Sequence, residues 1–202
     1  MTHPLFATIR DHYNACATGI ADSAKAMGWY SAFTQRLRFD VIGYAVDLSE
    51  KDILDVGCGD GALFQYLIDT GISATYKGID ISPEMIARAQ SRFPDIDVCC
   101  TNIASYDQSH DVVIASGAFA IGDKNAPLDF LDTLVCQLYA CSRSHVVFNV
   151  LSEHASIKEP LFCYYNPSDV LDICFKYTDY VTLNHAYLPN DFTIHMVNTE
   201  SL

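Results

Sequence analysis

Residues 51–67, KDILDVGCGDGALFQYL, constrain the fold more than any other stretch of the chain. A short apolar run ends at Val56, and an apolar-periodic segment begins a few residues later. Between them, glycines occupy three alternate positions: Gly57, Gly59 and Gly61. This order predicts a strand at 52–56, a tight loop, and a helix at about 61–70 that ends with Gly71 in the C′ position. Because glycine has no Cβ, such a loop can lie directly against a ligand.

Two classes of cofactor bind to a loop of this kind, dinucleotides and S-adenosylmethionine. The residues from Gly57 to Ala62 satisfy G-x-G-x-x-A, and Asp80 follows about 20 residues on, as a ribose-binding acid of a dinucleotide site should. Asp55 and Asp60, however, place negative charge where a pyrophosphate would lie, whereas a cationic amino group and a sulfonium gain from it. No arginine or lysine is expected near the loop to neutralise phosphates. These features favour S-adenosylmethionine.

Strand and helix signals alternate along the rest of the chain. Strands are expected at 75–82, 96–100, 110–117, 144–152, 180–188 and 191–198. Helices are expected at 4–18, about 30–48, 83–93 and 125–142, and from Asn166-Pro167 onward. The alternation predicts an α/β fold with a Rossmann-like, doubly wound sheet, mostly parallel, and Pro189-Asn190 joins the last two strands into an antiparallel hairpin. We expect one domain over 1–202, with 1–48 as an N-terminal helical extension or lid.

Composition excludes several classes of function. With 12 basic and 25 acidic residues the formal net charge is −13, so the surface would repel nucleic acid. No apolar run approaches the roughly 20 residues that span a bilayer, and the N-terminus lacks a secretory pattern. The 8 cysteines form no C-x-x-C pair, so no metal site is expected, and a reducing cytoplasm fits best.

Three motifs together resemble a known family. ILDVGCGDG, GIDISPEMIARA and HDVVIASG, in this order and spacing, look like those of the class I S-adenosylmethionine-dependent methyltransferases. The likeness covers about residues 50–150, and the closing hairpin is similar to the end of that family's seven-stranded sheet. It implies an enzyme that transfers a methyl group from S-adenosylmethionine and releases S-adenosylhomocysteine.

The resemblance implies roles for individual residues of the cofactor site. Gly57, Cys58 and Gly59 would lie under the methionine part, and Asp55 would hold its ammonium group. Asp80 would accept both ribose hydroxyls. The remaining cofactor contacts would come from Ile81 and Met85 on the adenine, Asn102 and Ile103 at its polar edge, and Ser116 and Gly117 beside the methyl group.

The N-terminal part and the loop after the fifth strand would surround the acceptor. Trp29 suits a lid, and Arg38 would bind a carboxylate of cofactor or substrate. His154 is the candidate base, and Tyr164 and Tyr165 would form an aromatic wall. Family members that methylate amide or adenine nitrogen carry Asn/Asp-Pro-Pro-aromatic after the fourth strand. This chain has SGAFAIGD there, which favours a small-molecule acceptor with an O, N, S or C nucleophile.

Two further runs extend the likeness to small bacterial members of the family. The first is GW, S, Q and RF between Gly28 and Phe39, and the second is YLP and DFT between Tyr187 and Thr193. Neither run names an acceptor or an oligomeric state. A catalytically silent S-adenosylmethionine-binding module and an NAD-dependent dehydrogenase remain as alternatives.

Overall fold

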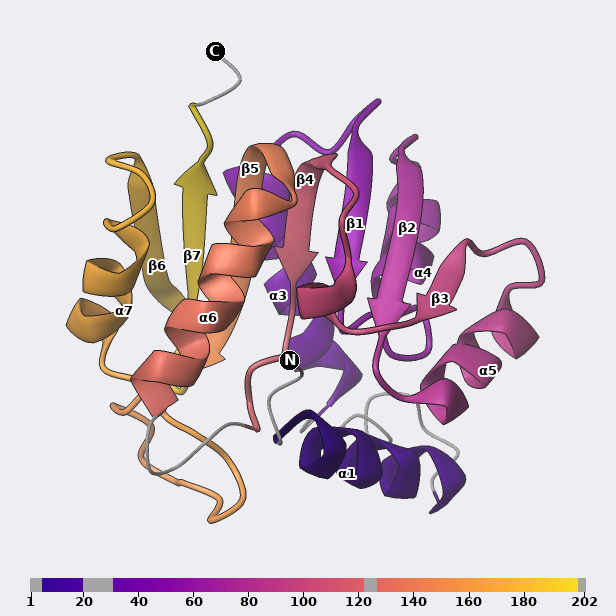
Figure 1. The fold of residues 1–202 in the computed structure, drawn as a ribbon, viewed down its shortest axis with the longest axis horizontal. Helices are drawn as coiled ribbons and strands as arrows, with labels where there is room; N and C mark the ends of the chain where they lie inside the picture. The colour runs from indigo at the N-terminus through magenta and orange to yellow at the C-terminus, as the bar shows by residue number, and fades with distance from the viewer. Residues whose placement is uncertain (1–4, 20–30, 122–126, 200–202) are drawn as a thin grey trace.

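The computed structural model describes residues 5–19, 31–121 and 127–199. Its centre is a seven-stranded sheet with the order β3-β2-β1-β4-β5-β7-β6 (Figure 1). The strands are β1 Asp52–Val56, β2 Thr75–Asp80, β3 Val98–Cys100, β4 His110–Ala115, β5 Ser142–Leu151, β6 Val181–Leu188 and β7 Asp191–Val197. The first five strands pair in parallel, while β7 is antiparallel to both of its neighbours. This confirms the expected doubly wound sheet with a closing hairpin.

Helices cover both faces of the sheet and its carboxyl edge. They are α1 Leu5–Gly19, α3 Ala32–Ala45, α4 Ala62–Thr70, α5 Pro83–Arg92, the 3₁₀ turn η1 Ile103–Ser105, α6 Pro127–Ala140 and α7 Pro167–Cys174. One apolar core joins the sheet to α6 and α7, and the other joins it to α3, α4 and α5. Because parallel strands end at the same edge, the loops after β1, β2 and β4 meet there, beside α1 (Figure 1).

Local chemistry sets the ends of the helices next to this edge. Gly71 ends α4 in the left-handed region at φ 68°, and the N–H of Ile72 bonds the Leu67 carbonyl at 3.0 Å. Ser82 caps α5 by accepting a hydrogen bond from the Met85 N–H at 3.1 Å, and Pro83 follows it. Both helix ends lie where the sequence predicts them.

The N-terminal helices have different positions. Helix α1 lies across the carboxyl ends of the central strands, as a lid would (Figure 1). Helix α3 buries Phe39 and Ile42 against the sheet and is part of the core. Helix α3 is therefore part of the domain core, and a lid formed by α1 stays a prediction.

Candidate active site

The loop after β1 needs its glycines. Gly57, Gly59 and Gly61 have φ of 76°, 54° and 85°, in the left-handed region that favours glycine. A Cβ on Gly57 would lie 2.8 Å from the Cβ of Ala118. The Gly57 N–H also bonds the Ile79 carbonyl at 2.8 Å, which ties the loop to β2. The loop thus presents bare backbone at the carboxyl edge of the sheet.

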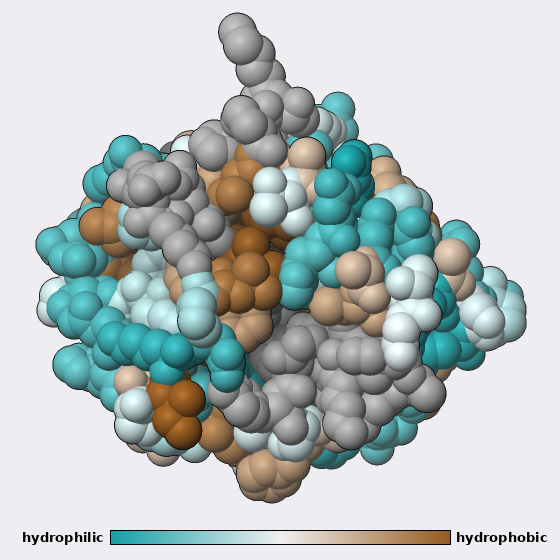
Figure 2. Space-filling model, turned by 90° about the horizontal axis from the view of Figure 1, so that it is seen from below, coloured by the Kyte–Doolittle hydropathy of each residue, from teal (hydrophilic) through white to brown (hydrophobic). Residues whose placement is uncertain are grey.

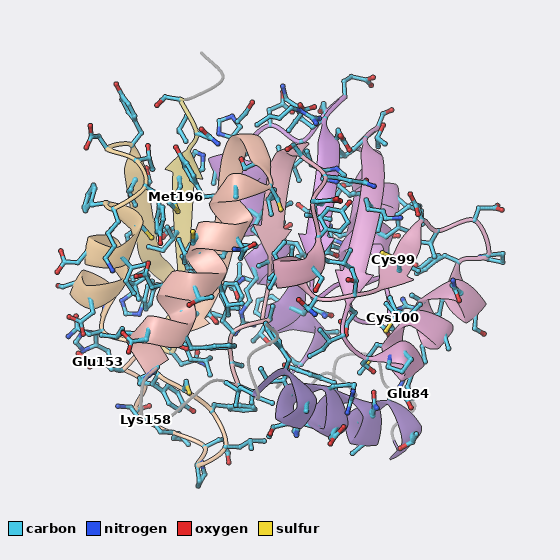
Figure 3. All side chains as sticks on the ribbon, in the orientation of Figure 1. Glu84, Cys99, Cys100, Glu153, Lys158 and Met196 are labelled. Carbon is cyan, nitrogen blue, oxygen red and sulfur yellow. The ribbon has the colours of Figure 1, made fainter. Side chains whose placement is uncertain are left out.

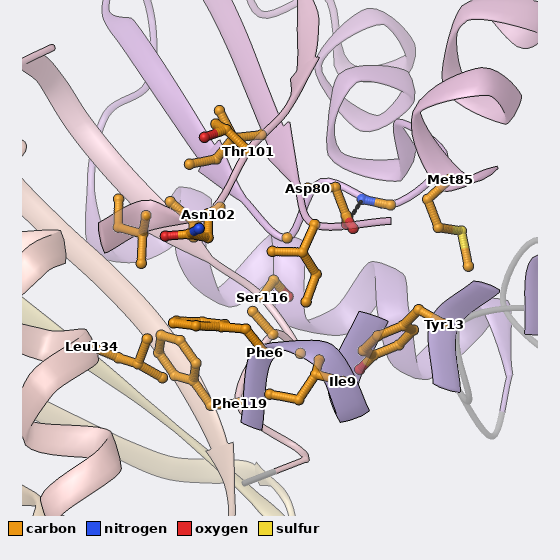
Figure 4. A pocket seen from close by; sticks show the side chains of 18 of the residues that line it. Phe6, Ile9, Tyr13, Asp80, Met85, Thr101, Asn102, Ser116, Phe119 and Leu134 are labelled. Carbon is orange, nitrogen blue, oxygen red and sulfur yellow. Dashed lines mark hydrogen bonds between the residues drawn. The ribbon is translucent and has the colours of Figure 1, made fainter. Parts of the chain in front are cut away.

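Asp80, the last residue of β2, holds this loop from the other side. One carboxylate oxygen accepts the Gly59 N–H at 2.9 Å (Figure 4), and the other accepts the Ser82 N–H at 2.8 Å. Burial raises the pKa of Asp80, while the N–H groups of Ser82, Gly59 and Ile81 act in the opposite direction. Each carboxylate oxygen keeps a further lone pair for a ligand hydroxyl.

A cavity lies between the glycine loop, α1 and α6, and we call it the first cavity (Figure 4). Most of the residues that the resemblance assigns to the cofactor line it: Gly57, Gly59, Asp80, Ile81, Met85, Asn102, Ile103, Ser116 and Gly117. Residues absent from that set complete its apolar wall, among them Phe6 and Ile9 of α1, Phe119, and Phe130 and Leu134 of α6. Seen from this edge, hydrophobic residues gather near the middle of the face, with hydrophilic residues on either side of them (Figure 2).

One polar atom in the first cavity points to a ligand. The Oδ1 of Asn102 is buried and has no hydrogen-bond partner among the described residues. A buried acceptor of this kind costs free energy unless a donor meets it. An adenine amine is such a donor, and Asp80 suits paired ribose hydroxyls. The residues present therefore fit S-adenosylmethionine.

Asp55 and Cys58 are not brought to the first cavity. Side chains alternate along a strand, so Asp55 faces the core of α3 and α4, opposite to Val56, which lines the cavity. There its carboxylate accepts the Tyr76 O–H at 2.7 Å, and burial raises the pKa of Asp55 to about 7. The side chain of Cys58 fills the space left by Gly78, where a Cβ would lie 2.9 Å from the Cys58 sulfur. Asp55 is thus directed away from the first cavity, which corrects its expected contact with the ammonium group, whereas the expected place of the Cys58 backbone under the methionine part stays a prediction.

Basic residues do stand beside the loop, contrary to the expectation. Arg92 of α5 lies 2.9 Å from the Asp60 carboxylate and donates to the Asp60 carbonyl at 3.0 Å. Arg88 lies 3.9 Å from the same carboxylate. Asp60 is fully buried, so this cluster fixes the loop onto α5. The expectation that no arginine or lysine lies near the loop is therefore wrong, and missing cations do not exclude a dinucleotide.

A second cavity, of about 280 Å³, adjoins the first. Its wall comes from α3, the ends of β5 and β6, the β6–β7 turn and the loop after β5, including Thr34, Arg38, Asn149, Phe162, Tyr164 and Asp191. Tyr13 and Gly117 line both cavities. Arg38, expected to bind a carboxylate of the cofactor or the substrate, lies in this second wall and pairs with Asp191, with nitrogen–oxygen distances of 2.9 and 2.8 Å.

The residues expected to act on the acceptor are divided. Tyr164 lines the second cavity, its hydroxyl accepts the Glu159 N–H at 2.8 Å, and Lys158 lies over its ring. Lys158 marks this loop below α6 in Figure 3. Tyr165 is 2% exposed and packs in the core, which corrects its place in the wall. His154 is exposed beside His185 and is not part of either cavity wall, and Trp29 lies outside the described residues.

Asn149 is a polar residue that the sequence analysis missed. It is 1% exposed within β5, between apolar neighbours in the run HVVFNVL. Its amide oxygen accepts the Gly117 N–H at 2.9 Å and its amide nitrogen donates to Ser116 at 3.0 Å. Asn149 therefore positions the two residues that follow β4, where the cavities meet. An amide inside an apolar strand was the available signal.

Comparison with known proteins decides the family. The family described as methyltransferase domain matches residues 53–139. Rv1506c of Mycobacterium tuberculosis, a methyltransferase by name, is 37% identical over 157 residues, which are 70% of this chain and 90% of that protein. The chain belongs to the class I S-adenosylmethionine-dependent methyltransferases. A malonyl-[acyl-carrier protein] O-methyltransferase of Acetivibrio thermocellus is 41% identical to this methyltransferase, but over 81 residues, 37% of this chain and 29% of that one.

Solved structures confirm the fold of the methyltransferase. The magnesium protoporphyrin IX methyltransferase of Synechocystis PCC 6803 with bound S-adenosylmethionine superposes with a TM-score of 0.70 at 14% identity, over 98% of this chain and 99% of that one. DhpI in complex with S-adenosylhomocysteine superposes with a TM-score of 0.72 at 15% identity, over 98% of this chain and 100% of that one. The family's cofactor is thus S-adenosylmethionine. In the described part of the methyltransferase, no helix is long and apolar enough to span a membrane, and no group of three or more His, Cys, Asp or Glu side chains is placed to hold a metal ion.

Proposed function

We propose that this methyltransferase transfers the methyl group of S-adenosylmethionine to a small molecule bound in the second cavity. One observation carries the proposal: Tyr13 and Gly117 line both the cavity that fits the cofactor and its neighbour. A donor and an acceptor in these cavities meet at that junction. Holding two reactants in contact supplies much of what a transfer reaction needs.

The residues of this chain bind and orient the reactants. S-adenosylmethionine supplies a methyl group already activated by its sulfonium. Gly57, Gly59, Asp80 and Asn102 would hold it in the first cavity. Tyr13 and the apolar side chains of α1 would exclude water from the first cavity, and Asn149 keeps Ser116 and Gly117 in place.

Tyr164 is the residue that we assign to the acceptor from the predicted aromatic loop. Its hydroxyl already accepts a backbone N–H, so its own proton is directed to another acceptor. Phe162 lines the same wall and offers an aromatic face. His154 and Tyr165 are left out of the proposal because neither is part of that wall.

Composition supports a small acceptor in a reducing compartment. The formal net charge of −13 disfavours nucleic acid, and a small molecule needs no large docking surface. The eight cysteines are all free thiols, as expected of a protein in the cytoplasm.

The test is a label-transfer assay with S-adenosylmethionine carrying a ¹⁴C-methyl group. The protein is incubated with a bacterial extract, and label is then counted in small-molecule, protein and nucleic-acid fractions. We expect label in the small-molecule fraction and its loss with Asp80→Ala. Label confined to protein or nucleic acid would contradict the proposal, and label in no fraction would support a silent binding module.

A further inference from the structure

The second cavity has one cationic and one anionic residue in its wall, and they are bound to each other. The Arg38 guanidinium places two nitrogens at 2.9 and 2.8 Å from the same oxygen of Asp191. The two residues are 5% and 2% exposed. Tyr187 donates its hydroxyl proton to the other carboxylate oxygen, and Arg38 also donates to the Thr34 carbonyl at 3.1 Å. The ion pair is thus buried, hydrogen-bonded and neutral overall.

The rest of the described wall is uncharged. It consists of aliphatic, aromatic, hydroxyl and amide residues, of which Phe162, Tyr164 and Asn149 are examples. A charged acceptor entering this space would lose its hydration, and the wall has no unmatched charge of opposite sign to replace it. Burying an ionised group without a partner is costly, whereas a neutral molecule meets no such cost.

The residues that line the second cavity favour a ring as its occupant. The volume of about 280 Å³ lies just below the roughly 300–1,000 Å³ of pockets for drug-sized ligands. Tyr13, Phe162 and Tyr164 contribute aromatic faces to the wall. Offset or edge-to-face contacts with such faces favour a flat aromatic partner.

We infer that the acceptor group held in the second cavity is an uncharged, single-ring compound, and that this choice follows from the neutral wall that the matched Arg38–Asp191 pair leaves. The inference rests on the proposed function, because it takes the second cavity as the acceptor site. It also gives a physical meaning to two runs that are far apart in the sequence: Arg38 comes from RF and Asp191 from DFT, 153 positions later. The wall is therefore neutral because its two charges match each other, although it does contain charged residues.

Binding of two matched probes tests the inference. 4-Hydroxybenzamide and 4-hydroxybenzoate have the same ring and hydroxyl, and they differ in the charge of one substituent. Their dissociation constants are measured by ligand-observed NMR on the whole protein saturated with S-adenosylhomocysteine. We expect the neutral amide to bind at least about tenfold more tightly, which corresponds to about 1.4 kcal/mol. Equal or tighter binding of the benzoate, or no binding of the amide at millimolar concentration, would overturn the inference.

Variants of the pair give the sharper test. Asp191→Asn leaves the Arg38 charge unmatched and should shift the ratio at least tenfold toward the benzoate. The double variant Arg38→Met with Asp191→Leu keeps the wall neutral and should retain the preference for the amide, even if Asp191→Asn folds poorly. Asp172→Asn, which removes the same charge from an exposed site on α7, is the control and should leave the ratio unchanged. A double variant that binds the benzoate as well as the amide would show that a neutral wall does not set the preference, and would overturn the inference.

The proposed function would fail in a different way. Ala120→Phe places a ring in the second cavity, so it should abolish binding of both probes and leave S-adenosylhomocysteine bound. If Ala120→Phe still transfers label to small molecules, the acceptor site lies elsewhere. If it blocks transfer while the benzoate binds wild type best, the site is right and the charge rule is wrong.

Discussion

The carboxylate of Asp80 accepts the backbone N–H of Gly59 at 2.9 Å, so the acid that ends β2 closes the glycine loop that follows β1. The same carboxylate accepts the Ser82 N–H at the start of α5. One side chain therefore fixes three segments around the first cavity before any ligand enters. Preorganisation of this kind lowers the entropic cost of binding.

Replacing Asp80 should reduce the affinity for the cofactor more than it reduces the stability of the fold. Asp80→Asn keeps one acceptor for the loop but loses the charge that strengthens hydrogen bonds to ribose, each worth about 1.5–3 kcal/mol. We expect the dissociation constant of S-adenosylhomocysteine to rise at least about tenfold by calorimetric titration. Asp95→Ala, at an exposed position, is the control. A change below about threefold would contradict the assignment.

Tyr13 should contribute to the rate of methyl transfer and little to the affinity for the cofactor. Burial and the nearby Asp80 carboxylate raise the pKa of Tyr13, so its hydroxyl stays protonated and serves as a donor at the junction. We expect Tyr13→Phe to lower kcat/KM for the acceptor about tenfold while the affinity for S-adenosylhomocysteine stays within about threefold. Tyr44→Phe, at a side chain that is 91% exposed, should change neither. Equal losses in both quantities would place Tyr13 in the cofactor site alone.

Asp55 should make the ligand-free protein less stable as pH rises. Its folded pKa of about 7 lies above its ordinary value of 3.8, so the folded state holds the proton more tightly than the unfolded state. This contribution is complete below pH 3.8 and is lost as pH rises through about 7, at about 1.4 kcal/mol per pH unit. In urea titrations, the free energy of unfolding of Asp55→Asn, relative to that of wild type, should therefore rise by about 3 kcal/mol between pH 5 and pH 8. If the free energies of unfolding of the two proteins had the same pH dependence, a buried Asp55 with a raised pKa would be excluded.

The His145–His195 contact should act in the opposite direction. The two ring nitrogens lie 3.1 Å apart across β5 and β7, and burial, then the charge of His145, lowers the pKa of His195 to about 4. The folded state resists protonation, so this contribution to stability is present above pH 6.5 and is lost as pH falls toward 4. His195→Gln should flatten the unfolding free energy over that window, and His154→Gln, at an exposed position, should not. If the free energy of unfolding of His195→Gln fell more steeply at acid pH than that of wild type, this explanation would be contradicted.

Local chemistry explains which features the sequence could predict. Gly71, Ser82 and Pro83 set helix ends through their own backbone conformations and short-range bonds, so their neighbours suffice to place them. Asp80 lies about 20 residues after the loop because one strand–helix–strand unit has that length. These signals required no knowledge of the rest of the fold.

Long-range contacts explain what the sequence did not predict. The Arg38–Asp191 pair joins a core helix to the last strand, and no spacing in the sequence announces it. Arg88 and Arg92 reach Asp60 only because α5 packs back against the glycine loop. Asp55 was assigned to the cofactor from its position in a motif, while the alternation of strand side chains turns it to the opposite face.

We propose that the first cavity binds the cofactor and that the second cavity binds the acceptor. The most direct measurement titrates S-adenosylhomocysteine into Asp80→Asn and Ala120→Phe and follows ¹⁴C-methyl transfer to small molecules by the same two variants. We predict that Asp80→Asn loses cofactor affinity, and that Ala120→Phe keeps it within about threefold but transfers at less than about a tenth of the wild-type rate with saturating cofactor. If Ala120→Phe loses cofactor affinity as Asp80→Asn does, or transfers methyl groups at the wild-type rate, the division of the site into two cavities is wrong.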